Sequence, residues 1–190
     1  TSLPQTGPPL PKLVPTNTKG EKIGMDILSR KAFYYNIWGT WCTACIQDTP
    51  YINKLVNSLR SHPDIVVVNL CLKSKADAWK NMIGDKQLLG LNLIIEEDSA
   101  SNNLEQLFKM EEDGYPFFLI VGGNRKVLGS GIGPDQGLLL PYVLLQAGNA
   151  MPVKTAARQF IDLARKMKKK DDPETKAFTL FLEEFGERTP

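Results

Sequence analysis

The chain reads FYYNIWGTWCTAC from residue 33 to residue 45, and this stretch decides the fold. Its first half is rich in aromatic residues and short enough to be a central β-strand. Its second half holds two of the three cysteines, Cys42 and Cys45, at the C-x-x-C spacing. Apolar residues recur at helical spacing after Cys45. The cysteine pair is therefore predicted to lie where a strand over residues 33–38 leads into a helix.

The segment that follows predicts alternating helices and strands. The first helix is expected to reach the break at residues 61–64, with Pro50 as a kink early in it. Residues 65–72 form a nearly unbroken apolar run, which is typical of a strand buried on both faces. The remaining expectations, in chain order, are a helix around residues 76–83, a strand over 91–95, a short helix around 104–108, a hairpin over 117–128 and a helix around 138–145. This order predicts an α/β fold.

Both ends of the chain depart from this alternation. Residues 1–16 carry five prolines and no helical pattern, so they are predicted to form an extended arm or linker. A turn signal around Gly20 then predicts a short N-terminal hairpin. Near the C-terminus, two amphipathic segments predict two further helices. We therefore expect one domain over residues 1–147 and a C-terminal two-helix extension over residues 148–190.

Composition limits the classes of function. Hydrophobic residues make up 42% of the 190 residues, which is enough to bury a core of ordinary size. The net charge of +2 is too small to indicate a nucleic-acid partner. No stretch reaches the ~18–20 apolar residues that a membrane helix needs. Because the chain opens at Thr1 without a methionine, we expect a trimmed chain or a mature form whose targeting segment was removed. We expect a monomer.

The cysteine pair carries the candidate chemistry. A sulfur at the first turn of a helix lies beside N–H groups and the positive end of the helix dipole, which stabilise its thiolate. Cys42 is therefore expected to be the more acidic thiol, because cysteines so placed have pKa values lowered to about 3.5–7.5. Cys42 would attack a disulfide, and Cys45 would resolve the mixed disulfide. This exchange needs no cofactor, and none is predicted.

The longer run NIWGTWCTACIQDTP, residues 36–50, resembles the extracytoplasmic TlpA/ResA-like branch of the thioredoxin superfamily. The resemblance covers residues 9–147. It implies a thioredoxin-like fold, with a central mixed sheet flanked by helices, and a thiol–disulfide oxidoreductase that reduces protein disulfides. It also implies a place in the periplasm or cell envelope, a membrane tether through a segment absent here, and a thiol–disulfide protein as electron donor. Thioredoxin itself has a buried aspartate where this chain has Asn36, which favours the TlpA/ResA-like branch.

The resemblance further implies roles for four residues near the pair. In that branch an acidic residue three positions after the second cysteine handles protons, and Asp48 occupies this position. Family members carry a cis-proline loop that faces the cysteines, and Tyr115 and Pro116 match it just before a predicted strand. Together with Trp41, these two residues are expected to bind the substrate chain as a short added strand.

Other interpretations of the same residues stay open. Cys71 is expected in the core rather than as a third reactive thiol, and His62 is expected to be a solvated loop residue. These two residues have no spacing that suits a zinc site, so no metal is predicted. One rival function is a metallochaperone that holds Cu(I) between the two thiolates. The other is a redox-inactive interaction module whose tail helices form the contact surface. Disulfide-reducing activity separates all three.

Overall fold

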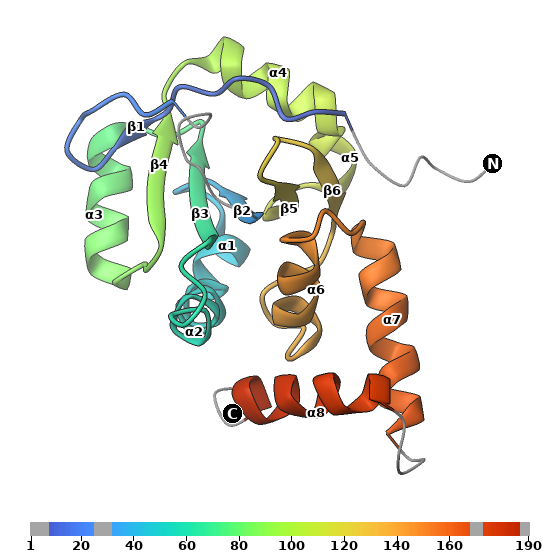
Figure 1. The fold of residues 1–190 in the computed structure, drawn as a ribbon. Coiled ribbons are helices and arrows are strands. Elements are labelled where there is room, and N and C mark those ends of the chain that lie inside the picture. Colours follow the sequence, from blue (N-terminus) through green and yellow to red (C-terminus); the bar gives the residue numbers. More distant parts are fainter. Residues whose placement is uncertain (1–7, 25–31, 168–172, 187–190) are drawn as a thin grey trace.

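The computed structural model describes residues 8–24, 32–167 and 173–186, and a six-stranded mixed sheet forms its centre (Figure 1). The strands lie in the order β1-β4-β3-β2-β5-β6. Their bounds are β1 (Thr16–Asn17), β2 (Ala32–Trp38), β3 (Ile65–Leu72), β4 (Leu91–Ile95), β5 (Phe117–Gly122) and β6 (Val127–Ser130). Strands β2, β3 and β4 run parallel, whereas β1, β5 and β6 pair antiparallel with their neighbours. The predicted thioredoxin-like arrangement of a mixed sheet with flanking helices is confirmed.

The helices follow the strands in the predicted order. Their bounds are α1 (Thr43–Gln47), α2 (Thr49–Ser58), α3 (Ala76–Lys86), α4 (Asp98–Phe108), α5 (Met110–Asp113), α6 (Leu139–Ala147), α7 (Val153–Lys166) and α8 (Pro173–Gly186). The helix after the cysteines divides at Asp48, and Pro50 lies in the first turn of α2. A proline is tolerated there because the first N–H groups of a helix have no partner within it. The predicted kink is therefore confirmed.

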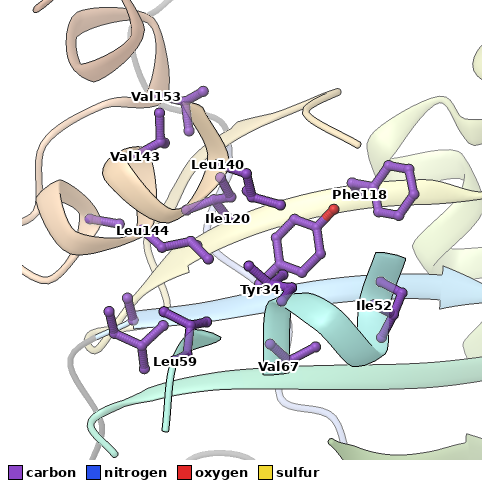
Figure 2. Packing of buried hydrophobic residues seen from close by; sticks show 14 of the residues in the cluster. Tyr34, Ile52, Leu59, Val67, Phe118, Ile120, Leu140, Val143, Leu144 and Val153 are labelled. Atoms are coloured by element: carbon purple, nitrogen blue, oxygen red, sulfur yellow. The ribbon is translucent and has the colours of Figure 1, made fainter. Parts of the chain in front are cut away.

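Apolar side chains cover both faces of the sheet. On one face, Tyr34, Val67 and Phe118 pack against helices α2 and α6, and Figure 2 shows Ile52 and Leu140 turned toward these strand residues. On the other face, a second cluster joins the sheet to α4 and α5. Every residue of β3 except Val66 is buried. The prediction from its apolar run, a strand covered on both sides, is thus confirmed.

The strand register brings the chemically important loops to one end of the sheet. Trp38, the last residue of β2, is the register partner of Cys71 near the end of the parallel strand β3. Ile37 pairs with Phe117, the first residue of the antiparallel strand β5. The segments after β2, after β3 and before β5 therefore meet at the same edge. These segments contain the cysteine pair, Lys73, and the Tyr115–Pro116 loop.

The N-terminal segment is extended, as predicted, but its described part is not a free linker. Pro9 forms a β-bridge with Lys126, and the Leu10 N–H donates to the Arg125 carbonyl at 2.9 Å. The Leu10 side chain is buried in the cluster over α4 and α5. The linker interpretation is therefore wrong for residues 8–15, because edge pairing and apolar burial hold them on the sheet. The predicted hairpin is present, with Thr16 opposite Lys22.

The two predicted C-terminal helices are confirmed as α7 and α8, and α8 lies crosswise to α7 in Figure 1. Phe178, Phe181 and Phe185 of α8 are buried and belong to the same apolar cluster as α6. His62 lies in a loop, as predicted, but it is half-buried rather than fully solvated. Its Nε2 lies 2.9 Å from Glu184 Oε1 and its ring stacks on Phe185, so α8 covers this loop. The division at residue 147 stays a prediction.

Candidate active site

A disulfide joins Cys42 and Cys45 where β2 leads into α1. Cys42 is the N-cap residue of α1, and its Sγ accepts a hydrogen bond from the Cys45 N–H at 3.1 Å. The Cys42 N–H donates to the Gly39 carbonyl at 3.0 Å, which turns the chain from strand to helix. The predicted strand-to-helix position of the pair is confirmed. A negative charge on Cys42 Sγ would lie beside the N–H groups of the first helical turn.

Solvent exposure does not distinguish the two sulfur-bearing residues. Cys42 is 6% exposed and Cys45 is 4% exposed in this disulfide form. The exposure of the two residues therefore does not identify which sulfur is the nucleophile. What distinguishes Cys42 is its capping position, because its sulfur accepts the N–H of the first turn. The adjoining residues Trp41 and Thr43 are exposed, so the pair lies directly beneath the surface.

The Tyr115–Pro116 loop lies beside Trp41. The peptide bond between Tyr115 and Pro116 is cis. The Tyr115 ring meets the Trp41 ring edge to face, with 4.9 Å between the ring centroids. Trp41 is 54% exposed, whereas Tyr115 and Pro116 are half-buried. The structure thus brings together the three residues that were predicted to bind substrate, next to the disulfide.

Asp48 lies one helical turn beyond Cys45, as the spacing predicts. Its N–H donates to the Ala44 carbonyl at 3.1 Å, and the residue joins α1 to α2. Partial burial, and then the negative charge of Asp135, raise the pKa of the Asp48 carboxyl above its ordinary value. Burial, followed by the charges of the same two aspartates, raises the pKa of Tyr34. Asp135, from the loop before α6, had no signal in the sequence that linked it to Asp48.

Cys71, the remaining thiol, is fully buried in β3 and not in a disulfide. Burial raises its pKa to about 11, although hydrogen bonds to Ser74 and Thr40 oppose the shift. A thiol with such a pKa is almost entirely protonated near neutral pH and is a poor nucleophile. The expectation of a core role for Cys71 is therefore confirmed.

Asn36 occupies the position where thioredoxin has a buried aspartate, and it joins a row of amides across the sheet. Its side-chain amide donates to Asn69 Oδ1 at 3.1 Å, and the Asn69 amide donates to Asn92 Oδ1 at 3.1 Å. The three residues are register partners on β2, β3 and β4. An amide does not titrate, so this position cannot accept a proton from a cysteine.

Three residues outside the sequence motifs form hydrogen bonds with the segment before Cys42 or with Tyr115. The Trp41 indole N–H donates to the Lys73 carbonyl at 3.1 Å. The Thr40 N–H donates to Ser74 Oγ at 3.0 Å. Glu105 of α4 accepts a hydrogen bond from the Tyr115 hydroxyl at 2.7 Å. Their sequence context carries no signal for this role, since Glu105 lies in a short helix and Lys73 and Ser74 follow an apolar strand.

Residues 8–24, 32–167 and 173–186 contain neither a membrane-spanning helix nor a cluster of metal-binding side chains. No helix in these ranges is long and apolar enough to cross a membrane. Within the same ranges, no three or more histidine, cysteine, aspartate or glutamate side chains come together in a way that could hold a metal ion.

Known proteins resemble this chain in both sequence and fold. The Redoxin family model matches residues 5–138. The thiol-disulfide oxidoreductases ResA of Bacillus thuringiensis (strain Al Hakam) and of Bacillus anthracis are each 41% identical to it over 130 residues, which cover 64% of this chain and 73% of theirs. The crystal structure of the thioredoxin domain of a Bacteroides vulgatus thiol-disulfide oxidoreductase superposes with a TM-score of 0.58 at 17% identity, covering 70% of this chain and 91% of that one.

A thioredoxin-like sheet that carries a Cys-x-x-Cys disulfide at the start of a helix, together with these relatives, defines a thiol–disulfide oxidoreductase. The class is thus an enzyme whose reacting groups are cysteine sulfurs. Within it, the chain belongs to the Redoxin family of the thioredoxin superfamily and is a ResA/TlpA-like protein.

Proposed function

We propose that this oxidoreductase reduces disulfide bonds of proteins outside the cytoplasm. The Cys42 thiolate attacks one sulfur of the substrate disulfide, joins to it, and releases the other substrate sulfur as a thiolate. The Cys45 thiolate then attacks Cys42 Sγ, which forms the Cys42–Cys45 disulfide and releases the second substrate sulfur. Two electrons pass from the cysteine pair to the substrate. A thiol–disulfide electron-donor protein restores the two thiols.

The observation that carries the proposal is the position of Cys42 Sγ at the start of α1, 3.1 Å from the Cys45 N–H. A sulfur that already accepts a backbone hydrogen bond keeps that bond, and a stronger one, when it becomes a thiolate. The thiolate of Cys42 is therefore favoured near neutral pH. Cys71 is excluded as the nucleophile in this scheme because burial raises its pKa to about 11.

Asp48 is proposed as the group that takes the proton from Cys45 before its attack. Its position one turn along the same helical run supports direct transfer or transfer through one water molecule. Its raised pKa lies closer to the working range than that of an ordinary aspartate. The neutral Asn36 amide cannot serve in this way.

The substrate is proposed to lie along Trp41, Tyr115 and Pro116 as a short extended segment. The exposed Trp41 ring offers an apolar surface, and the half-buried Tyr115 offers backbone groups. Pairing through the backbone accepts many side-chain sequences, which suits an enzyme that acts on polypeptides.

The proposed place of action is the periplasm or cell envelope, with a membrane tether outside this sequence, and the proposed state is a monomer. Similarity of residues 36–50 to the extracytoplasmic branch supports the location. A membrane-impermeant maleimide should label Cys42 in intact cells after mild reduction. Sedimentation of the purified protein measures the oligomeric state.

A mixed-disulfide trap tests the proposed function. In Cys45→Ser the covalent intermediate cannot resolve, so disulfide-linked substrates should accumulate on Cys42 and be identified by mass spectrometry. The double variant Cys42→Ser/Cys45→Ser keeps only Cys71 and should capture none. Adducts on Cys71 would contradict the assignment. Retained Cu(I) without disulfide-reducing activity would favour the metallochaperone.

The reduction potential of the Cys42–Cys45 pair tests the direction of electron flow. Equilibration with thiol–disulfide buffers should give a value near the ~−270 mV of strong dithiol reductants. A value near the ~−120 mV of dithiol oxidants would instead assign the protein to disulfide formation.

A further inference from the structure

Four residues from four segments form a closed ring of contacts beside the disulfide: Trp41, Lys73, Glu105 and Tyr115. The Trp41 indole N–H donates to the Lys73 carbonyl at 3.1 Å, and the Trp41 and Tyr115 rings meet edge to face at 4.9 Å. The Tyr115 hydroxyl donates to Glu105 Oε1 at 2.7 Å. The Lys73 ammonium forms an ion pair with Glu105 Oε2. Each oxygen of the Glu105 carboxylate thus holds a different loop of the site.

Glu105 is the member of this ring whose burial is energetically unfavourable. The residue is only 5% exposed on α4, and burial of a carboxylate is unfavourable unless it is paired and hydrogen-bonded. Its partner Lys73 is exposed, so the ion pair between them contributes little net stability. Stability alone therefore gives no reason for a carboxylate here. The carboxylate instead fixes the positions of two groups, because one oxygen binds a tyrosine hydroxyl and the other binds a lysine ammonium.

The two loops that Glu105 holds are the two sides of the proposed substrate site. Lys73 lies in the left-handed region with φ of +50°, directly after β3, and its carbonyl fixes the exposed Trp41 ring. Ser74, the next residue, accepts the Thr40 N–H at 3.0 Å. Tyr115 precedes Pro116 on the opposite side. A shift of either loop would change the distance between Trp41 and the proline loop.

We propose that Glu105 is a positioning residue that holds Trp41 and the Tyr115–Pro116 loop at the separation needed to bind an extended polypeptide, and that it thereby favours peptide disulfides over small disulfides. This inference rests on the proposed function. A polypeptide contacts both sides of the site, so its binding depends on their separation. A small disulfide needs only the sulfur of Cys42. Loss of the Glu105 contacts should therefore weaken binding of peptides without changing the chemistry of the cysteine pair.

Single-turnover kinetics of the pre-reduced full chain test this inference without an electron donor. The substrates are insulin, as a polypeptide disulfide, and 5,5′-dithiobis(2-nitrobenzoic acid), as a small one. Glu105→Gln removes the charge that pairs with Lys73, and Tyr115→Phe removes only the hydroxyl and keeps the ring on Trp41. Glu97→Gln is the matched control, because Glu97 is exposed at the other end of α4. Glu105→Asp tests rescue by a shorter carboxylate.

For insulin, Glu105→Gln and Tyr115→Phe should each raise the half-saturating concentration about five- to tenfold, the size expected when one charge-assisted hydrogen bond no longer holds the site. The limiting rate should stay within about twofold of wild type, as for the loss of a contact that acts on binding alone. For Glu105→Gln, the rate with the small disulfide and the reduction potential should match those of wild type, and Glu97→Gln should match wild type with both substrates. Glu105→Asp should lie between wild type and Glu105→Gln.

Equal losses with both substrates, or no loss with insulin while the wild type is active, would overturn the positioning role and leave the proposed function standing. A wild-type protein that reduces neither substrate would overturn both. The indole N–H resonance of Trp41 gives a second readout that does not need activity. Glu105→Gln should move this resonance and leave those of the buried Trp38 and Trp79 in place, whereas an unmoved Trp41 resonance counts against the inference.

Discussion

The disulfide end of the sheet and the cluster formed by α6, α7 and α8 are built on opposite principles. At the disulfide end, polar contacts to Lys73, Ser74 and Glu105 hold a tryptophan that is 54% exposed. In the helical cluster, aromatic rings pack on one another with centroid separations between 5.0 and 6.5 Å, and the members are Tyr142, Phe160, Phe178, Phe181 and Phe185. The first region contains the reactive sulfurs and the polar contacts that orient the groups around them, whereas the second region contributes buried apolar area.

Because of this difference, substitutions in the two regions should change activity and stability separately. Burial of large rings contributes to stability in proportion to the apolar area removed from water. Directional polar contacts contribute little net stability but fix the positions of groups. Changes at the disulfide end should therefore alter activity more than folding, and changes in the helical cluster should do the reverse. Each prediction below tests one side of this contrast.

The largest expected effect is on activity, in Cys42→Ser. Removal of the nucleophilic sulfur should lower the rate of disulfide reduction more than about a thousandfold, as is typical when a covalent nucleophile is lost. The unfolding midpoint should match that of the reduced wild type, since neither protein contains the Cys42–Cys45 disulfide. Insulin reduction and thermal unfolding measure the two quantities. If Cys42→Ser loses its fold as well as its activity, activity and stability are not separable at the disulfide end.

The largest expected effect on stability is in Phe185→Ala. This ring is fully buried and stacks on Phe181 and His62, so its removal should lower the free energy of unfolding by about 3–5 kcal/mol. Leu180→Ala on the same helix is the control, because Leu180 is 59% exposed and should change stability by less than about 0.5 kcal/mol. Denaturant unfolding measures both. If folded Phe185→Ala is also inactive, the helical cluster takes part in the chemistry.

A smaller kinetic effect is expected for Asp48→Asn. The variant keeps the shape and removes the titrating group, so reduction of a model disulfide should slow by about a hundredfold, within the range of general acid–base catalysis. Its pH dependence should change as well, because Asp48 no longer titrates near its raised pKa. Rates from pH 5 to pH 9, a range that brackets carboxyl and thiol groups, measure this. Identical rates across that range would make Asp48 an ordinary helix residue.

The same variant tests the sign of the pKa shift through stability. Burial and Asp135 raise the pKa of Asp48 in the folded protein, so the fold favours the protonated form. The contribution of Asp48 to stability is therefore present below the ordinary aspartate pKa and is lost as the pH rises through the raised value. Asp48→Asn should unfold at a higher temperature than wild type at pH 8, with the difference shrinking toward pH 3. A difference that grows at low pH would mean that the pKa is lowered.

The smallest expected effect is in His62→Ala, at the rim of the helical cluster. The substitution removes the stacking on Phe185 and the contact with Glu184, which is partly exposed. The free energy of unfolding should fall by about 0.5–1.5 kcal/mol, mostly from the aromatic contact. Activity should not change. A loss as large as that of Phe185→Ala would contradict the minor role assigned to His62 in holding α8.

The sequence by itself predicts the architecture of the sheet and the chemistry of the site, for a local reason. Apolar periodicity follows from backbone geometry, so the run over residues 65–72 identified a strand covered on both faces without knowledge of its neighbours. The Cys-x-x-Cys spacing likewise places Cys42 at a helix start within one short segment. The order of helices and strands from residue 32 to residue 147 agrees with the structure, apart from the short helix α5, which was not predicted, because the other elements each carry their own pattern.

Tertiary structure alone decided what lies around the disulfide and what holds the two ends of the chain. In α4, the apolar Leu107 is 41% exposed whereas the charged Glu105 is 5% exposed, the reverse of what their polarity predicts. Glu105 is buried because α4 brings it against Lys73, from a segment far away in the sequence, and against Tyr115, ten residues further along the chain. His62 is covered for a similar reason, by a helix far along the chain. Such polar contacts have no local pattern, since they exist only when folding brings their partners together.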